Sequence, residues 1–426
     1  MRILLLGAAG FIGRHILTDL VAHGHDVTAV VRSKAGLETA FPKVRFLAAD
    51  LSKATHEADW SAHLQGIALI VNAAGILRGK DMDAVHVHMP RALYAAAVNA
   101  GVRRAILISA ISARPAVETD YAQSKLEGEA VLRASRLDWT ILRPSLVYGD
   151  GSYGGTSLIR GLAALPLFTP IPGNGNFSFT PIEVRDLARA VRIACEDERF
   201  SGQCLEPVGP DTFNVRELLA QYRAWLGFGK AHFLHVPMPI MRLLGRMGDM
   251  AGDGPVSTNS LMQMVEGNTG DSAAFAQAVG FMPQALDDAL NARPAQVQDR
   301  WHARLFFLAP LVKAALVFLW IASALLGFFT GAARTMEMLQ ALALPAYLAD
   351  PMRIGSSILD LVVAGAVLFD RRVRWSTMLQ LVVVFGYTAV LGLALPSLWL
   401  DPLGSLLKNL PIIALILVHG AIGNKR

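Results

Sequence analysis

The chain has 426 residues, of which 53% are hydrophobic and only 17% are charged, an apolar balance for a soluble protein. Its net charge of +5 comes without a basic stripe interleaved with aromatic residues, so nucleic-acid binding is not expected. The length suits one large domain and a second unit, and the apolar excess lies almost entirely after residue 300. We therefore expect a globular domain followed by a membrane domain.

The chain begins with an apolar strand that runs into a glycine-rich turn. Gly7 permits a tight bend, Gly10 lets the backbone approach a pyrophosphate, and Gly13 lets the following helix pack on the strand. The helix N-terminus offers free N–H groups to phosphates. A turn of this kind between a strand and a helix predicts a dinucleotide site. The expected contacts are Gly7, Ala9, Gly10, Phe11, Ile12 and Gly13.

Short apolar runs alternate with helical stretches over the first 290 residues. The expected strands are 27–31, 44–47, 69–72, 105–109 and 140–142. The expected helices include 14–23, 90–100 and 121–135. This alternation predicts βαβ units and an α/β, doubly wound parallel sheet of the Rossmann type.

The end of the second strand indicates which cofactor is bound. An acidic residue at this place usually holds the ribose 2′-OH of NAD, whereas a basic residue accommodates the 2′-phosphate of NADP. Arg32 occupies the position, with Ser33 beside it, so the sequence favours NADP(H). NAD(H) stays the alternative, because a solvated loop charge would give the same pattern.

Several motifs resemble the short-chain dehydrogenase/reductase superfamily. They are Ala48-Ala-Asp50-Leu51, Val71-Asn-Ala-Ala-Gly75 and Tyr121-Ala-Gln-Ser-Lys125. The segments 142–149 and 180–187 resemble its extended and atypical members, the nucleoside-diphosphate-sugar epimerases and NmrA-like proteins. The resemblance places segment 180–186 in a small substrate lobe. It also implies cofactor contacts at Asp50, Leu51, Ala73, Ala74, Gly75, Lys125, Pro144, Ser145 and Val147.

Tyr121 and Lys125 are the expected catalytic pair. Four residues apart near the start of a helix, they share one face. A cation beside a phenol lowers the phenol pKa, so Tyr121 could exchange a proton with a substrate while hydride moves to or from a nicotinamide. The resemblance also has Lys125 bind the nicotinamide ribose.

A serine or threonine usually completes this site in the family. The family position falls on Ile111, which leaves Ser112 as the first candidate and Ser109 as the next. Either serine could instead cap backbone groups in the loop. We expect no metal site, because His86 and His88 have no cysteine or carboxylate at ligand spacing, and Cys195 and Cys204 are expected to be packing residues with free thiols.

Four long apolar stretches follow the first domain, at 306–329, 354–369, 376–395 and 403–422. Each is near the roughly 20 residues that cross a bilayer. Lysine and arginine gather on one side if the spans alternate, which predicts a multi-pass inner (cytoplasmic) membrane protein with a cytosolic N-terminal domain and C-terminus. The residues that carry this bias are Arg300, Arg304, Arg371, Arg372, Arg374, Lys425 and Arg426.

The segment Leu398-Trp-Leu-Asp401-Pro-Leu-Gly404 resembles the DoxX-like family of four-helix membrane domains. We therefore expect three parts, a Rossmann domain at 1–290, a linker at 291–304 and a DoxX-like four-helix bundle at 305–426. Lys408 and His419 are ionisable groups expected within the fourth span. Lys408 either reaches the nearby interface or pairs with Asp401 or Asp360 in a polar site inside the bundle.

Two functions fit these features. The first is a membrane-tethered NADP(H)-dependent oxidoreductase or epimerase that acts on a quinone, an isoprenoid or a lipid-linked sugar. The second is a non-catalytic NADP(H)-binding redox sensor or assembly factor, similar to the NmrA-like regulators and to the NADPH-binding accessory subunit of respiratory complex I. The Tyr121/Lys125 pair favours the first, and the displaced serine favours the second.

Overall fold

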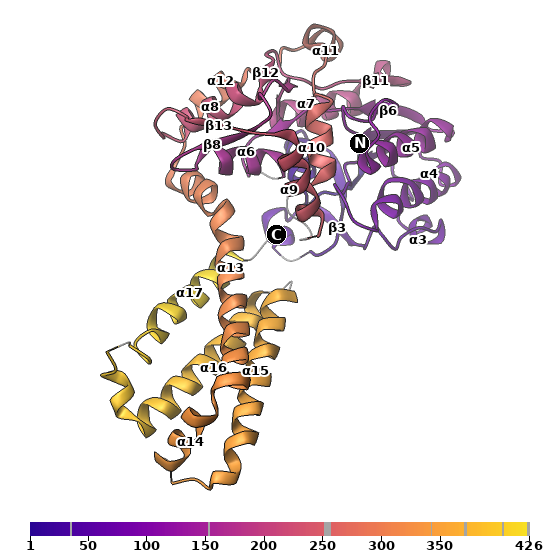
Figure 1. Cartoon of the computed structure of the whole chain (residues 1–426). Helices are drawn as coiled ribbons and strands as arrows, with labels where there is room; N and C mark the ends of the chain where they lie inside the picture. Colours follow the sequence, from indigo (N-terminus) through magenta and orange to yellow (C-terminus); the bar gives the residue numbers. More distant parts are fainter. Residues whose placement is uncertain are drawn as a thin grey trace. The chain divides into compact units, whose positions relative to one another are not determined.

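The computed structural model describes residues 1–34, 36–151, 154–250, 257–341, 343–369, 373–402 and 404–423. The chain divides into two compact units, Met1–Ala303 and Arg304–Arg426 (Figure 1). We describe each unit by itself.

The first unit is built on a seven-stranded sheet in the order β11-β6-β5-β4-β1-β2-β3, in which every pairing is parallel. The doubly wound fold predicted from the sequence is thus confirmed. The strands are β1 (Arg2–Leu6), β2 (Asp26–Val31), β3 (Arg45–Ala48), β4 (Leu69–Asn72), β5 (Arg104–Ile108), β6 (Asp138–Leu142) and β11 (Gln203–Leu205). The order reverses between β1 and β4, and ligands of such sheets bind at the carboxyl ends of the strands beside this point.

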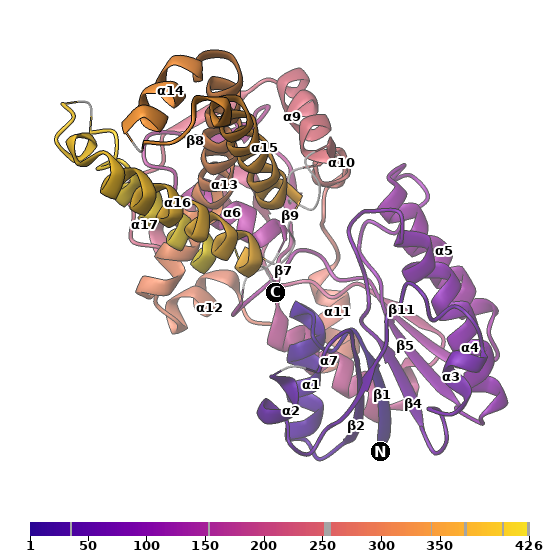
Figure 2. The ribbon, with the colours of Figure 1, turned by 90° about the horizontal axis from the view of Figure 1, so that it is seen from below.

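Both faces of the sheet are covered by helices (Figure 2). Ile3 and Leu5 pack with α1 and α7 on one face, whereas Leu4 and Leu6 pack with α3 and α4 on the other. This burial on both sides explains why β1 reads as an unbroken apolar run. The helices around the sheet are α1 (Phe11–Ala22), α2 (Leu37–Ala40), α3 (Ala58–Ser61), the π-helical turn η1 (Ala84–His88), α4 (Met89–Asn99), α5 (Asp120–Ala134) and α7 (Val184–Glu196).

The remainder of the first unit forms a smaller lobe with its own buried core, which includes Tyr148, Leu219 and Leu286. Its strands pair only two at a time: β7 (Val147–Tyr148) with β10 (Ile182–Glu183), β9 (Ser178–Phe179) with β12 (Phe213–Asn214), and β8 (Thr169–Pro172) with β13 (Phe233–Val236). Its helices are α6 (Gly155–Ala163), α8 (Val215–Trp225), α9 (Met238–Met250), α10 (Thr258–Val265) and α12 (Leu286–Ala292). The short turn η2 (Glu198–Phe200) and α11 (Ser272–Val279) instead pack on the core of the sheet beside α7. The predicted linker 291–304 is helical from Val297, where α13 begins.

The second unit is helical and has a small apolar core around Leu316, Val363, Val384 and Ile416. Its elements are α13 (Val297–Thr330, which starts in the first unit), α14 (Ala332–Ala341), η3 (Ala346–Leu348), α15 (Ala349–Phe369), α16 (Val373–Ala394), η4 (Pro396–Trp399) and α17 (Asn409–Ile422). Among the described residues, three helices are long and apolar enough to cross a membrane, namely Val297–Thr330, Ala346–Phe369 and Val373–Leu393.

The fourth predicted span is shorter than expected. Helix α17 has 14 residues and is therefore about 21 Å long, less than the roughly 30 Å of a bilayer core. The apolar composition begins earlier, but Gly404 adopts a φ of 65° and the chain turns until Asn409. Four of the basic residues used to predict topology, and the first residue of this span, lie outside the described residues: Arg371, Arg372, Lys425, Arg426 and Leu403.

Candidate functional site

The glycine-rich turn links β1 to α1 as expected. Gly7 has a φ of 75°, and a Cβ there would lie 2.7 Å from the carbonyl oxygen of Ala73. A Cβ on Gly13 would collide with the Gly7 carbonyl oxygen, so only glycine lets α1 pack this closely on the turn. Gly10 is the N-cap of α1 and no side chain caps the helix. The first N–H groups of α1 are thus left for a ligand, which is what a pyrophosphate needs.

The loop after β4 faces this turn across the switch point. Buried Asn72 accepts a hydrogen bond from the Ala74 N–H at 3.1 Å and donates one to the Tyr94 hydroxyl at 3.3 Å. These bonds hold the loop in place. Gly75 is exposed, and Ala73 is partly exposed. The segment that the family resemblance assigns to the cofactor therefore lies at the carboxyl edge of the sheet, beside Gly7.

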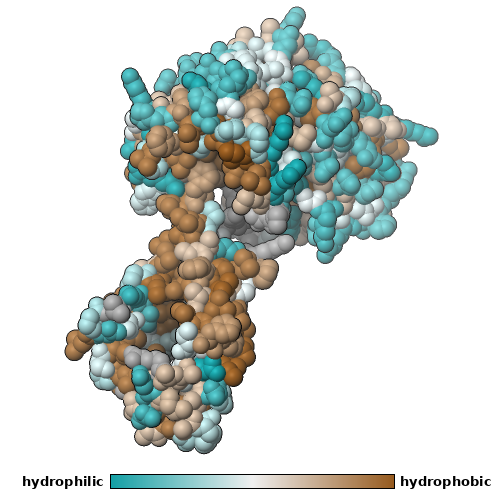
Figure 3. All heavy atoms as spheres, viewed as in Figure 1, coloured by the Kyte–Doolittle hydropathy of each residue, from teal (hydrophilic) through white to brown (hydrophobic). Residues whose placement is uncertain are grey.

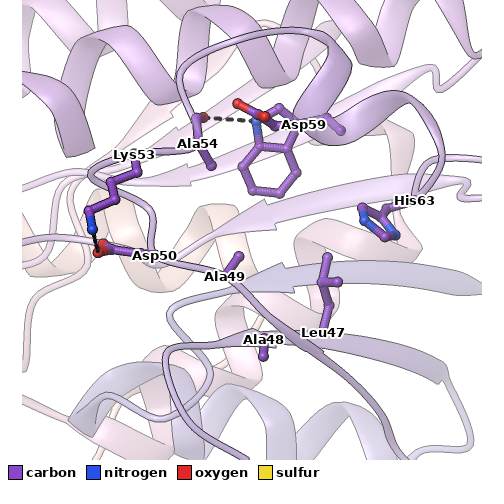
Figure 4. A pocket seen from close by; sticks show the side chains of 9 residues that line it. Leu47, Ala48, Ala49, Asp50, Lys53, Ala54, Asp59 and His63 are labelled. Atoms are coloured by element: carbon purple, nitrogen blue, oxygen red, sulfur yellow. Dashed lines mark hydrogen bonds and ion pairs between the residues drawn. The ribbon is translucent and has the colours of Figure 1, made fainter.

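The ends of β2 and β3 bring Arg32 and Asp50 together. Arg32, Ser33 and Asp50 are all exposed. The pKa of Asp50 lies below its ordinary value, mainly because the Ser52 hydroxyl donates a hydrogen bond to it at 2.9 Å, and the charge of Arg32 adds to the effect. A pocket lies beside Asp50, between the end of β3 and α3 (Figure 4). Arg32 is placed where a 2′-phosphate contact is expected.

Helix α5 carries the Tyr121/Lys125 pair. Thr119 caps the helix by accepting a hydrogen bond from the Ala122 N–H at 3.1 Å, so both residues lie in its first turns. The Lys125 Nζ donates to the carbonyl oxygens of Ile108 at 3.2 Å and Ala74 at 3.5 Å. The ammonium group therefore sits where β4 and β5 end. It would also lie 3.1 Å from a Cβ on Gly75, which shows how closely α5 approaches the cofactor loop.

The titration of this pair differs from the sequence prediction. Burial raises the pKa of Tyr121 to about 12, and Lys125 does not lower it. Burial also lowers the pKa of Lys125 to about 8, an effect that the charge of Glu129 partly opposes. The ammonium group is directed toward two carbonyl oxygens, so desolvation dominates at the phenol. At neutral pH the Tyr121 phenol is thus protonated.

His86 joins the cofactor loop to α5, a role that the sequence did not reveal. Its Nε2 accepts a hydrogen bond from the Ile76 N–H at 3.1 Å, and its Nδ1 lies 2.9 Å from the Ser124 hydroxyl. Ser124 in turn donates to the Tyr121 carbonyl, which requires the Nδ1–H tautomer of His86. The His86 ring also meets the Tyr121 ring edge-on at 5.8 Å. Burial and the charge of Lys125 lower the pKa of His86 to about 2, so the ring is neutral.

The two candidate serines differ in their surroundings. The Ser109 hydroxyl donates to the buried carboxylate of Glu129 at 2.6 Å, and Arg143 forms a bidentate ion pair with the same carboxylate. Ser112 is only 4% exposed, yet its hydroxyl makes no hydrogen bond within the part of the chain that is described. Ile111, at the family's usual position, belongs to the apolar core. The Ser109 hydroxyl is therefore committed to Glu129, whereas the buried Ser112 hydroxyl has no partner among the described residues.

Asn268 ties the segment around Pro144 to the lobe. Its carbonyl oxygen accepts hydrogen bonds from the Ser145 hydroxyl and, at 3.3 Å, from the Thr180 hydroxyl. Ser145 is thereby fixed, and Val147 belongs to the first short strand of the lobe. The segment around Pro144 and the segment 180–186 are therefore joined both by the pairing of β7 with β10 and through Asn268, a residue that sequence patterns did not mark.

No group of three or more His, Cys, Asp or Glu residues could hold a metal ion among the described residues. His88 is exposed. Cys195 is buried and Cys204 is exposed, and both are free thiols.

The second unit contains a polar network at Asp360. The Ser323 hydroxyl donates to its carboxylate at 2.6 Å, and the Tyr387 hydroxyl donates at 3.3 Å. Lys408 is exposed and is the N-cap of α17, so it lies before the helix and not one turn inside it. Asp360 is therefore bonded to neutral hydroxyl groups, and these two described residues do not form the Lys408–Asp360 pair that was one alternative for Lys408. His419 is buried in the last turn of α17.

Comparison with known proteins gives two matching family models. Residues 7–162 match the NAD(P)H-binding model and residues 317–417 match the DoxX-like family. A ceramide reductase of Caulobacter vibrioides is 26% identical over 253 residues, which are 58% of this chain and 76% of that protein. The mitochondrial NADH dehydrogenase [ubiquinone] 1 alpha subcomplex subunit 9 of Rattus norvegicus is 24% identical over 278 residues, 61% of this chain and 70% of that protein.

Solved structures match the first unit. A nucleoside-diphosphate-sugar epimerase from Staphylococcus aureus has a TM-score of 0.56 at 20% identity, covering 68% of this chain and 99% of its own. A UDP-glucuronic acid 4-epimerase from Bacillus cereus, solved with UDP-glucuronic acid and NAD, has a TM-score of 0.53 at 20% identity, covering 68% and 97%. At this identity they show the fold alone. The chain thus combines a region that matches the NAD(P)H-binding family model, within a fold that these epimerases share, and a region that matches the DoxX-like model and contains helices long and apolar enough to cross a membrane.

Proposed function

We propose that the first unit is an NADP(H)-dependent reductase that acts on a carbonyl group of a membrane-associated lipid. The observation that carries the proposal is the position of α5. It brings the buried Lys125 ammonium to the carboxyl ends of β4 and β5, one helical turn from Tyr121 and beside Gly75 of the loop after β4.

Three side chains have distinct roles in this reaction. Tyr121 holds its proton at neutral pH, because burial raises its pKa to about 12, and donates it to the substrate oxygen. Ser112 hydrogen-bonds the same oxygen, since its hydroxyl has no partner within the described residues. Lys125 binds the nicotinamide ribose and favours the developing negative charge on that oxygen. The bound cofactor supplies the hydride.

The residues present fit NADP(H). The uncapped N-terminus of α1 suits the pyrophosphate, and exposed Arg32 suits a 2′-phosphate. Ser33, Asp50 and Leu51 then border the adenosine. The remaining expected contacts are Ala9, Phe11, Ile12, Ala73, Ala74, Gly75, Pro144, Ser145 and Val147. NAD(H) would use the same contacts without the phosphate.

A lipid substrate is supported by two observations. One relative is a ceramide reductase, and the second unit has three helices of membrane-spanning length and composition. The panel of test substrates therefore contains a ceramide-type lipid, together with quinones, isoprenoid aldehydes and lipid-linked sugars. We further propose that the protein lies in the inner membrane with the first unit in the cytosol, as the distribution of basic residues predicts.

The test uses the full chain in lipid nanodiscs, with NADPH consumption followed over this panel. Tyr121→Phe should keep cofactor affinity and lower turnover on the order of a hundred-fold, because the proton donor is lost. Ser112→Ala should lower turnover without lowering the unfolding temperature. Its matched control, Ser109→Ala, should lower the unfolding temperature and leave turnover unchanged, because it removes the buried hydrogen bond to Glu129. Undiminished turnover in Tyr121→Phe would overturn the assignment.

The second candidate function is a non-catalytic NADP(H)-binding subunit or assembly factor of a membrane complex. It is favoured by the relatives among the NADH dehydrogenase subunits. In that case NADPH would bind, no member of the panel would be turned over, and a membrane complex would be recovered with the tagged protein. Loss of NADPH binding in a Gly10→Val variant should then release that complex.

A further inference from the structure

Helix α9 presents an unusual row of apolar side chains to the outside of the lobe. Ile240, Leu243, Leu244 and Met247 are 49%, 57%, 43% and 57% exposed. At the α-helical period they fall within an arc of about 100°. Four large side chains in one continuous stripe differ from the scattered exposed apolar residues of an ordinary surface. We call these four residues the α9 stripe.

The opposite side of α9 is anchored to α10. A Cβ on Gly245 would lie 3.2 Å from the Thr258 backbone nitrogen, so the two helices touch at the backbone. The Asp249 carboxylate accepts hydrogen bonds from the Thr258 hydroxyl at 2.6 Å and from its N–H at 3.2 Å. This anchor fixes the rotation of α9. The stripe therefore points outward because of the packing, and not because the helix is loosely attached.

The polar side of α9 carries positive charge. Arg242 and Arg246 are both exposed there, Arg246 next to the stripe and Arg242 on the side of Asp249. Asp249, the acidic residue of this helix, is already bonded to Thr258. Met262 and Val265 of α10 are also exposed, at 39% and 42%. Figure 3 shows brown atoms bordered by teal over the part of the lobe where Figure 1 labels α9 and α10. An exposed apolar stripe on a helix whose polar side carries arginines is typical of a helix that lies in the headgroup region of an anionic membrane.

The end of α9 reaches the loop of the candidate site. Arg78 donates a hydrogen bond to the Gly248 carbonyl oxygen at 3.4 Å and lies 4.0 Å from the Asp249 carboxylate. Arg78 follows Gly75 and Ile76, which contact Lys125 and His86. A surface bound by α9 would thus lie beside the loop that lines the proposed active site.

We propose that α9 is an interfacial helix: the α9 stripe inserts into the headgroup region of an anionic bilayer, and Arg242 and Arg246 bind lipid phosphates. Because the same chain carries three candidate membrane spans, a bilayer stays within reach of the lobe. The proposal stands on the exposure, anchoring and charge of α9. It does not depend on the proposed chemistry.

The test places a fluorophore on the stripe of the full chain. Leu243→Cys is labelled with an environment-sensitive dye in a Cys204→Ser background, since Cys195 is buried. Asp288→Cys, an exposed position on α12 of the same lobe, is the matched control. Both labelled proteins are reconstituted into nanodiscs of phosphatidylglycerol and phosphatidylcholine, or of phosphatidylcholine alone. Quenching of the dye fluorescence by a lipid with a spin label high on its acyl chain is then compared with quenching by iodide.

We expect the lipid quencher to act several-fold more strongly at position 243 than at 288, and iodide to act more weakly. The difference should shrink in phosphatidylcholine alone, and equally in an Arg242→Gln/Arg246→Gln variant. Equal lipid quenching at the two positions would overturn the proposal. An apolar dye environment that persists in detergent would also overturn the proposal, because it would indicate that the membrane unit covers α9. Energy transfer between dyes at position 243 of two copies would overturn it as well, because it would indicate that α9 binds a second copy. Because the readout is not activity, the protein can pass this test while the proposed reductase activity fails.

Discussion

Replacing Lys125 by methionine should stabilise the first unit at neutral pH while it removes the proposed activity. Lys125 is 5% exposed, and burial lowers its pKa from 10.5 to about 8. Below about pH 8 the lysine is charged in both the folded and the unfolded chain, so the folded state bears the full cost of burying the charge. That cost is about 3 kcal/mol at 1.36 kcal/mol per pKa unit. Methionine loses the hydrogen bonds to Ala74 and Ile108, each worth about 1 kcal/mol.

At about pH 6.5 the Lys125→Met protein should therefore be about 1 kcal/mol more stable than the wild type, and the sign of this difference should depend on pH. Between about pH 8 and 10.5 the folded wild type has released the proton that the unfolded chain still holds, so wild-type stability rises with pH. By about pH 9.5 this rise is about 2 kcal/mol, and Lys125→Met should then be the less stable protein. The assay is thermal unfolding of the cofactor-free full chain, followed by tryptophan fluorescence, with a shift of roughly 2 °C per kcal/mol for a unit of this size.

Lys80→Met is the control, because Lys80 is exposed and its loss should change the unfolding temperature little at either pH. A Lys125→Met protein that is less stable than the wild type at both pH values, by a constant amount, would refute the reasoning. It would mean that the ammonium group contributes net stability through its carbonyl contacts and that burial costs less than the pKa of Lys125 implies.

Two further predictions concern the cofactor and His86. Arg32→Ala should weaken NADPH binding roughly ten- to a hundred-fold and leave NADH binding nearly unchanged, as measured by calorimetric titration, because one charge-assisted phosphate contact is lost; equal losses would assign Arg32 to another role. Burial lowers the pKa of His86 to about 2, so the ring stays neutral in the folded state, whereas in the unfolded chain it takes up a proton below about pH 6.5. The free energy of unfolding should therefore fall by up to about 1.4 kcal/mol per pH unit on acidification. His86→Gln, which cannot titrate, should show a shallower slope in denaturant unfolding between about pH 4 and 6.5, and an unchanged slope would contradict the neutral, buried ring.

The sheet could be predicted because its signals are local. The strand Arg2–Leu6 is buried on both faces, which requires an unbroken apolar run, and Gly7 follows it with a φ of 75°, a backbone conformation that favours glycine. The cap at Thr119 likewise places Tyr121 and Lys125 at the start of a helix. Each of these features depends on a few consecutive residues, so the sequence alone is informative about them.

The lobe and the end of the membrane unit could not be predicted in the same way. Strands such as Val147–Tyr148 and Phe213–Asn214 have two residues each, too few for any periodicity. In the last apolar stretch, composition does not distinguish a helix from the turn that Gly404 begins, so the predicted span was about one and a half turns too long. The α9 stripe has a clear helical period, but its exposure follows from the anchor of Asp249 on Thr258, which only the tertiary structure reveals.

Some features of the candidate site follow from local sequence, and others depend on the tertiary structure. The pair on α5 is a local pattern, but the pKa of each member is set by burial, which depends on the strands and loops around α5. The sequence ranks Ser112 before Ser109 because Ser112 adjoins Ile111, and the contact of Ser109 with Glu129 reveals the different surroundings of the two serines. His86 lies 35 positions before Tyr121, and its function becomes visible when a π-helical turn directs it between Ile76 and Ser124. His86 joins the loop after β4 to helix α5, which carries the proposed proton donor. Because its ring is neutral, Lys125 is buried beside Gly75 with no second positive charge next to it. A protonated ring would repel the Lys125 ammonium in this buried site.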